Sequence, residues 1–309
     1  MRPLALPVAL VLAALPLVAH AKHQAPQSAQ TDQKVHKVEQ VADGIYCIFG
    51  QGGNIGLIVT DRHAVLIDDQ YERIAPGLLA AIKTVTDKPI KYLINTHHHG
   101  DHTGANLVLE KQVMAIVAHA NVRKRLETSQ AKLEPAERGG LPELALGEED
   151  SRVRARLDIH LDGTDLHLVH FGPGHTDGDV LVGIPAKHVI HMGDTFILGM
   201  LPIIDTEGGG SFEGLVAQIE VVASFLPEDS KVIPGHGAVS GKKELLRYRD
   251  FLRALQAHVK AGPGRKPKEL AESFDTKAWP EWQPVSPFVT WESLFAAASG
   301  QGPGIARRP

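Results

Sequence analysis

The nine residues THHHGDHTG, at positions 96–104, are the most informative stretch of this sequence. They directly follow Ile90–Asn95, an apolar run typical of a buried β-strand. In extended backbone, alternate side chains point to the same side, so His97 and His99 can converge on one metal ion. Because imidazole is a common ligand of zinc, this spacing predicts a metal centre at the end of a strand.

The second half of the stretch predicts a second metal ion beside the first. Gly100 permits a turn, after which Asp101 and His102 can face a neighbouring ion. The carboxylate of Asp101 adds a hard oxygen ligand and a negative charge. The alternative is a histidine-rich loop that binds metal adventitiously, which an isolated His-x-His would favour. An aspartate and a further histidine at these offsets after a strand favour a built site instead.

Three further segments each place a candidate ligand beside glycine at the end of an apolar strand. They are GPGHTDG at 172–178, HMGD at 191–194 and PGHG at 234–237, and the candidates are His175, Asp194 and His236. Loops at strand ends are where a rigid scaffold usually carries its functional residues. Taken alone, each candidate is explained as a turn residue. Together with the first stretch, they predict one shared site.

Strand and helix signals alternate along the chain without a linker-like break. The first half is expected to form strands at 35–41, 45–49, 55–60, 64–68, 90–95 and 113–118, and helices at 74–85, 103–109 and 120–137. The second half is expected to form strands at 156–160, 165–171, 180–184, 189–191 and 231–233, and helices at 211–225, 242–260 and 290–298. Two mixed sheets packed together, with helices outside, would bury all of this as one domain over residues 35–309.

The motif His97-x-His99-x-Asp101-His102, followed in order by His175, Asp194 and His236, resembles the metallo-β-lactamase superfamily. The resemblance extends from about residue 35 to the helix that follows His236. It implies an α/β fold, a four-layer αβ/βα sandwich of two mixed sheets with helices outside. It also implies a two-zinc site along one edge of the two sheets.

The resemblance further implies a role for each candidate. By position, the first zinc ion would be held by His97, His99 and His175. The second would be held by Asp101, His102 and His236, and Asp194 would bridge the two ions. Asp101 would also be catalytic, because it would orient the nucleophile and could carry its proton to the leaving group.

The implied activity is that of a two-zinc, β-lactamase-like hydrolase in which a hydroxide between the metals attacks a carbonyl and opens a cyclic amide, a β-lactam. The alternatives are a lactonase, a thioesterase of the hydroxyacylglutathione hydrolase kind or, in another class, a zinc-binding protein without hydrolysis. Cysteine-bearing β-lactamases of the family have Cys where Asp194 stands. Lactonases, hydroxyacylglutathione hydrolases and some exported β-lactamases share the all-His/Asp set. Many of those β-lactamases place a cation shortly after the bridging position, whereas residues 195–230 contain no Lys or Arg.

Composition excludes several other classes of protein. Lys and Arg total 32 against 36 Asp and Glu, which gives a formal net charge of −4. The chain therefore lacks the basic excess of a nucleic-acid-binding protein. The expected partner is a small-molecule substrate. The single cysteine, Cys47, lies in an apolar run and is expected to be a buried structural thiol. The remaining histidines have no ligand-like pattern, and His98 is left without a role.

The N-terminus predicts export. One arginine, an apolar run and the ending Ala19-His20-Ala21 make residues 1–21 a secretory signal peptide. Residues 22–34 are polar and Gln-rich, and are expected to be a flexible lead-in. The mature protein is therefore expected to be periplasmic or secreted, with no later segment apolar enough to span a membrane. Its oligomeric state is left open.

Overall fold

The structure, a computed structural model, describes residues 36–146 and 155–304. Its strands form two sheets. The first runs in the order β1 (Lys37–Ala42), β2 (Ile45–Phe49), β3 (Ile55–Val59), β4 (Ala64–Ile67), β5 (Ile90–Ile94), β6 (Ala115–His119) and β7 (Leu144–Leu146). The second runs in the order β13 (Ser240–Gly241), β12 (Lys231–Ile233), β11 (Val189–His191), β10 (Leu181–Ile184), β9 (Thr164–His170) and β8 (Ala155–Leu161).

Both sheets are mixed, as predicted. Strands β1 to β4 form an antiparallel meander, and β4 to β7 then pair in parallel. In the second sheet, β8 to β11 are antiparallel, β11 and β12 are parallel, and β13 is antiparallel to β12. Parallel neighbours end at the same edge of a sheet, which brings together the loops that follow β4, β5, β11 and β12.

Eight α-helices complete the described chain. They are α1 (Ala75–Lys83), α2 (Gly100–Thr103), α3 (Asn106–Leu109), α4 (Ala120–Gln130), α5 (Phe212–Phe225), α6 (Lys242–Ala261), α7 (Pro267–Ser273) and α8 (Trp291–Ala298). Most match the expected ranges, with three differences. The expected helix 103–109 is split between α2 and α3, α7 was not predicted, and the expected helix 120–137 ends at Gln130. Pro135 explains this last difference, because a proline cannot continue a helix past its first turn.

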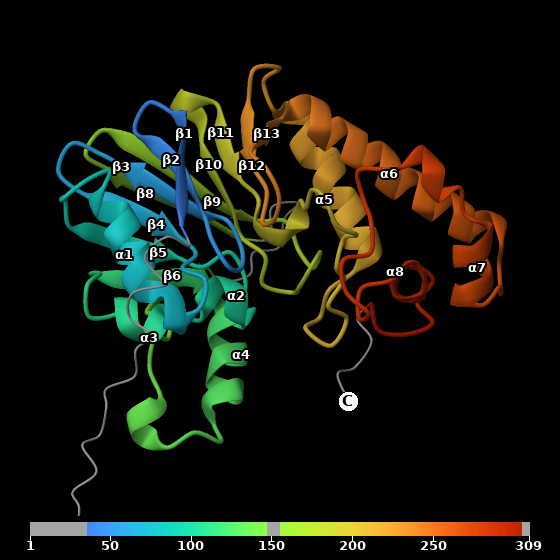
Figure 1. Cartoon of the computed structure of the whole chain (residues 1–309), viewed down its shortest axis with the longest axis horizontal. Coiled ribbons are helices and arrows are strands. Elements are labelled where there is room, and N and C mark those ends of the chain that lie inside the picture. Colours follow the sequence, from blue (N-terminus) through green and yellow to red (C-terminus); the bar gives the residue numbers. More distant parts are fainter. Residues whose placement is uncertain (1–35, 147–154, 305–309) are drawn as a thin grey trace, which may run out of the picture.

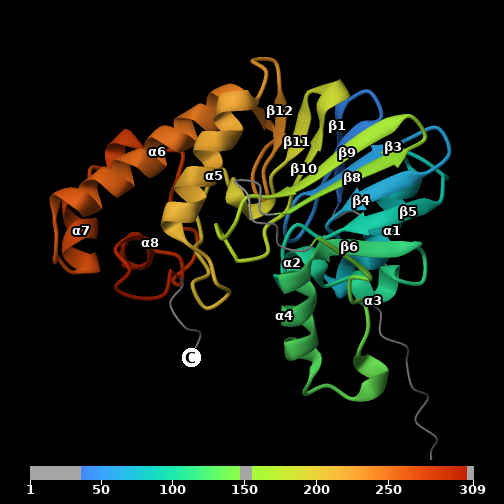
Figure 2. The same cartoon turned by 180° about the vertical axis from the view of Figure 1, so that it is seen from behind.

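Three hydrophobic cores separate four layers, which confirms the predicted αβ/βα sandwich. One core lies between the sheets and contains Ile67 and Val117 from the first sheet with Leu168 and Val182 from the second. A second core packs the outer face of the first sheet against α1 and α3. The third packs the second sheet against α5, α6 and α8. Figures 1 and 2 show these helices on opposite sides of the stacked sheets.

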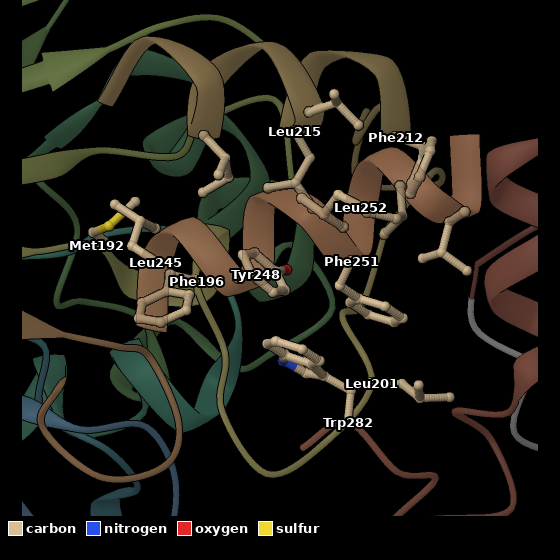
Figure 3. Packing of buried hydrophobic residues seen from close by; sticks show 14 of the residues in the cluster. Met192, Phe196, Leu201, Phe212, Leu215, Leu245, Tyr248, Phe251, Leu252 and Trp282 are labelled. Atoms are coloured by element: carbon tan, nitrogen blue, oxygen red, sulfur yellow. The ribbon is translucent and has the colours of Figure 1, made fainter. Parts of the chain in front are cut away.

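The third core is rich in aromatic side chains, which Figure 3 shows around α6. Phe251 stacks on Trp282 with ring centroids 4.7 Å apart and an interplanar angle of 2°. The indole Nε1 of Trp282 donates a hydrogen bond to the carbonyl of Ile197 at 2.9 Å. Because Ile197 lies three residues after Asp194, this core supports a segment that carries a predicted metal ligand.

The remaining expectations about the fold have mixed outcomes. Cys47 is fully buried, and its burial raises the pKa of the thiol to about 12, in keeping with a structural role. Among the described residues, no helix combines the length and the apolar character that a membrane span requires. The predicted signal peptide, residues 1–21, and the lead-in, residues 22–34, lie outside the described residues.

Candidate metal centre

The seven predicted ligands come from four stretches of the sequence and meet at one edge of the two sheets. His97 and His99 follow β5, and Asp101 and His102 lie in α2. His175 follows β9, Asp194 follows β11 and His236 follows β12. Figures 1 and 2 show α2 at this edge, next to the start of α4.

A first group of four side chains could hold one metal ion: His97, His99, His175 and Asp194. Their donor atoms lie within 4.8 Å of one another. Nδ1 of His99 is 3.2 Å from Nε2 of His97 and 3.0 Å from Nε2 of His175. These separations suit a tetrahedral zinc ion, whose nitrogen ligands at 2.0–2.1 Å stand about 3.3 Å apart.

A second group lies directly beside the first and contains Asp101, His102 and His236. Oδ2 of Asp101 is 3.3 Å from Nε2 of His236 and 3.7 Å from Nε2 of His102. Asp194 connects the two groups through its two oxygens. Its Oδ1 is 3.2 Å from His102 Nε2, while its Oδ2 is 3.6 Å from His175 Nε2. The carboxylate therefore stands where a bridging ligand would.

Unpaired buried atoms show that these residues fit a bound metal ion. His102 Nε2 and Asp194 Oδ1 are buried and have no hydrogen-bond partner among the described residues. Buried polar atoms are normally hydrogen-bonded, so two such atoms facing each other in one cluster need a partner. A cation between them satisfies both, and the three imidazoles and one carboxylate of the first group are a donor set that zinc prefers.

In the first group the protonation states suit metal binding, which requires neutral imidazole and ionised carboxylate, whereas Asp194 raises the pKa of His102 and raises that of His236 to about 9, so these two rings would release a proton when a metal binds. Burial lowers the pKa of His175 to about 4, and burial together with neighbouring histidines holds the pKa of His97 well below its usual range. Burial alone would raise the pKa of Asp194. The charges of His236 and His102 outweigh it and hold that pKa well below the ordinary value.

Partners behind the ligands fix which nitrogen faces the centre. His175 Nδ1 donates to the carbonyl of Ile203 at 2.7 Å, and His102 Nδ1 donates to Oδ2 of Asp68 at 2.8 Å. Each contact leaves Nε2 for the metal. For His99 the arrangement is reversed, because its Nε2 donates to Oδ2 of Asp205 at 2.9 Å and leaves Nδ1 free. Such outer hydrogen bonds orient ligands and make them more basic.

Sequence reasoning missed both of these aspartates. Asp68 is fully buried and also accepts hydrogen bonds from the backbone N–H and the hydroxyl of Thr96, each at 2.7 Å. It immediately follows β4, so the strand-end context that pointed to the ligands could have found it. Asp205 lies in a loop, 106 residues from His99, and no sequence pattern relates the two.

The loops that carry the second group are held by close contacts. The Nδ2 of buried Asn54 donates to the carbonyls of Pro234 and Gly237, both at 2.8 Å, and so braces the loop around His236. Gly53 lies against the ring of His102, where a Cβ atom would overlap the imidazole. Only glycine allows the turn between β2 and β3 to approach the site so closely.

The other histidines lie elsewhere or at the rim. His119 and His170 are buried and pack together with ring centroids 4.1 Å apart. On the surface, His160 pairs with Asp165 and His188 pairs with Asp229. His98 lies between two ligands, and its Nε2 is 3.6 Å from Asp205 Oδ2.

The sequence is similar to those of known proteins. A family model described as the metallo-beta-lactamase superfamily matches residues 48–236. The chain is 29% identical over 203 residues to hydroxyacylglutathione hydrolase GloC of Haemophilus influenzae. The aligned region covers 65% of this chain and 93% of that protein. It is 24% identical over 223 residues to a metallo-beta-lactamase type 2 of Bacteroides fragilis, which covers 68% of this chain and 82% of that one.

Solved structures share the fold. A metallo-beta-lactamase from Pontibacter korlensis aligns with a TM-score of 0.57 and 20% identity, over 71% of this chain and 99% of its own. A stereoselective inverting sec-alkylsulfatase from Pseudomonas sp. aligns with a TM-score of 0.69 and 15% identity, over 87% of this chain and 50% of its own. The sandwich fold and the clustered His and Asp side chains agree with membership of the matched family. The match over residues 48–236 shows that this chain belongs to the metallo-beta-lactamase superfamily.

Proposed function

We propose that this protein is a two-zinc hydrolase that cleaves an activated acyl bond in a small molecule. The observation that carries the proposal is Asp194, whose two oxygens face two adjacent groups of ligands. His97, His99 and His175 would hold one ion, and Asp101, His102 and His236 the other. A bound zinc pair would supply Lewis-acid polarisation of a carbonyl and activation of water for attack on it.

Asp101 is the residue best placed to handle the proton in this proposal. Its side chain is 25% exposed, whereas that of Asp194 is 3% exposed, so Asp101 lies at the mouth of the site. Its Oδ2 is 3.3 Å from His236 Nε2, and a hydrogen bond from His236, with the charges of His102 and His236, outweighs burial and lowers the pKa of this carboxyl. An ionised carboxylate at the mouth can orient water and accept its proton.

Two substrate classes are the first to test. The expected signal peptide and the family favour a β-lactam, because those drugs act outside the cytoplasm. The names of the relatives favour a thioester, since hydroxyacylglutathione hydrolases of Haemophilus influenzae and Methylococcus capsulatus are 29% and 28% identical to this chain. For a β-lactam substrate, we also propose that the protein is periplasmic or secreted.

A hydrolysis panel on the zinc-loaded protein tests the proposal. The panel contains a chromogenic β-lactam, an acyl-homoserine lactone and lactoylglutathione, each assayed with and without a chelator. We expect turnover of at least one, lost on chelation and restored by zinc. Binding of zinc without turnover of any member would instead support a protein that only binds the metal.

A further inference from the structure

A pocket of about 410 Å³ lies beside the candidate metal centre. It is lined by His98, by Asp177 and by one face of α4 that includes Asn121, Lys124 and Arg125. Residues spaced three and four apart share a helix face, so the α4 residues point into the pocket together. Figures 1 and 2 show α4 starting next to α2 and running away from the sheets.

His98 connects the pocket to the metal centre. Its ring centroid is 4.7 Å from that of His99. Its Nε2 lies 3.6 Å from the Asp205 oxygen that also accepts the hydrogen bond of His99. A small molecule that occupies the pocket therefore lies one side chain away from a predicted ligand.

Hydrogen bonds hold α4 firmly against a ligand loop. The guanidinium of Arg125 donates to both oxygens of Asp177, through Nε at 2.8 Å and through Nη2 at 2.5 Å. Nδ2 of Asn121 donates to the carbonyl of Asp177 at 3.0 Å. Because Asp177 lies two residues after His175, these bonds tie the pocket wall to the loop that carries a predicted ligand.

One cation among the residues that line the pocket has no ion pair. Three consecutive cations lie on α4, and both outer ones are paired: Arg123 with Glu127 at 2.9 Å and Arg125 with Asp177. Lys124, between them, is exposed and makes no side-chain hydrogen bond or ion pair with the residues that the structure describes. Since Arg125 and Asp177 neutralise each other, the ammonium of Lys124 is the unpaired charge among the lining residues.

We propose that this pocket binds a carboxylate of the substrate while the scissile carbonyl lies at the metal centre, and that Lys124 makes the ionic contact. The proposal rests on the hydrolase function above and narrows its substrates to acids. A single free ammonium complements a singly charged group.

The test compares acids with their esters. The substrate that the panel identifies, a β-lactam acid or lactoylglutathione, is assayed on the zinc-loaded full chain beside its methyl ester, which for lactoylglutathione is the dimethyl ester because that molecule has two carboxylates. We expect Lys124→Ala to raise KM for the acid by up to roughly fivefold, the upper end for an exposed ion pair, with kcat and the ester's KM unchanged. Lys124→Arg keeps the charge and should keep the wild-type KM. Lys243→Ala, an exposed cation on α6, is the matched control.

Equilibrium binding separates this inference from the proposed function. Calorimetry with the intact β-lactam acid, lactoylglutathione and their methyl esters uses zinc-loaded Asp101→Asn protein, in which turnover is expected to be slow. We expect tighter binding of an acid than of its ester, a difference that shrinks with salt and disappears in Asp101→Asn/Lys124→Ala. If the acid binds more tightly than its ester in this way but the wild-type protein hydrolyses no substrate, the proposed hydrolase function is rejected and the carboxylate-binding pocket is supported. Equal binding of acid and ester, or no effect of Lys124→Ala, overturns the inference even if hydrolysis is confirmed.

Discussion

His99 is held between the candidate metal centre and a carboxylate behind it. Its Nδ1 faces the nitrogens of His97 and His175, while its Nε2 donates to Asp205 at 2.9 Å. Asp205 touches no predicted ion in this arrangement, so it acts by positioning the ring. Outer-shell contacts of this kind commonly change metal affinity by about 10- to 100-fold.

We therefore expect Asp205→Asn to weaken zinc binding about tenfold or more, because the variant keeps the shape of the side chain but loses its charge. Competition with a chromophoric chelator measures the affinity. Asp165→Asn is a matched control, since Asp165 forms a comparable pair with His160 at 2.6 Å on the exposed β8–β9 hairpin. Unchanged zinc affinity in Asp205→Asn would remove Asp205 from the site.

Asp101 is expected to affect chemistry more than metal binding. Asp101→Asn keeps the size of the side chain but removes the charge and the proton acceptor. Turnover should fall by about 10²–10⁴-fold, the usual range for general acid–base catalysis. Metal content must be measured on the same sample, because lost zinc would imitate lost catalysis. Near-wild-type turnover in a fully loaded Asp101→Asn protein would contradict the proposed role.

At the junction of β6 and α4, one buried histidine begins the helix that forms the pocket wall. His119 Nδ1 accepts a hydrogen bond from the backbone N–H of Asn121 at 3.2 Å, in the manner of a helix N-cap. Burial and the neighbouring His170 lower the pKa of His119 to about 4. The helix therefore starts on an imidazole that must stay neutral.

This junction predicts a dependence of stability on pH. Between about pH 6.5 and pH 4, the unfolded chain binds a proton at His119 that the folded chain excludes, so the free energy of unfolding falls as the pH falls. The shift corresponds to about 3 kcal/mol at most. His119→Asn keeps an acceptor for Asn121 but cannot titrate, so its stability should fall less steeply over this range. Parallel urea-denaturation profiles of the two proteins would contradict the assignment.

For the molecule as a whole, the metal centre joins both sheets, since its ligands follow β5 in the first and β9, β11 and β12 in the second. Ions bound there would link the two halves of the sandwich. A ligand that binds only the folded state stabilises it by about 2.7 kcal/mol at a concentration 100 times its dissociation constant. Bound zinc should therefore contribute to the stability of the entire domain.

We expect the protein to bind two zinc ions per chain and to unfold at a lower temperature after chelation, with recovery when zinc is restored. Elemental analysis gives the stoichiometry, and calorimetry gives the midpoint. Asp194→Ala removes both bridging oxygens, so it should bind less zinc and respond weakly to the chelator. An identical midpoint with and without zinc, or one ion per wild-type chain, would count against the seven-ligand assignment.

The sequence by itself was sufficient for the alternating strands, the hairpins and the seven candidate ligands, whose side chains the structure brings together. These features depend on local periodicity and on turn residues beside strand ends, which a single chain displays directly. The short strands β7 and β13 and the helix α7 escaped prediction, because so few residues carry little periodic signal. The three cations at 123–125 were visible, but not which of them would be free.

Only the tertiary structure decided what surrounds the ligands. Asp68 reaches His102 across 34 residues, Asp205 reaches His99 across 106, and Arg125 reaches Asp177 across 52. Each pair meets because separate strand ends and helices converge at one edge of the sandwich. No local pattern encodes such a meeting, since the packing of whole layers determines which distant side chains become neighbours. For the same physical reason, the charge of Lys124 became informative only once Asp177 was seen to neutralise Arg125.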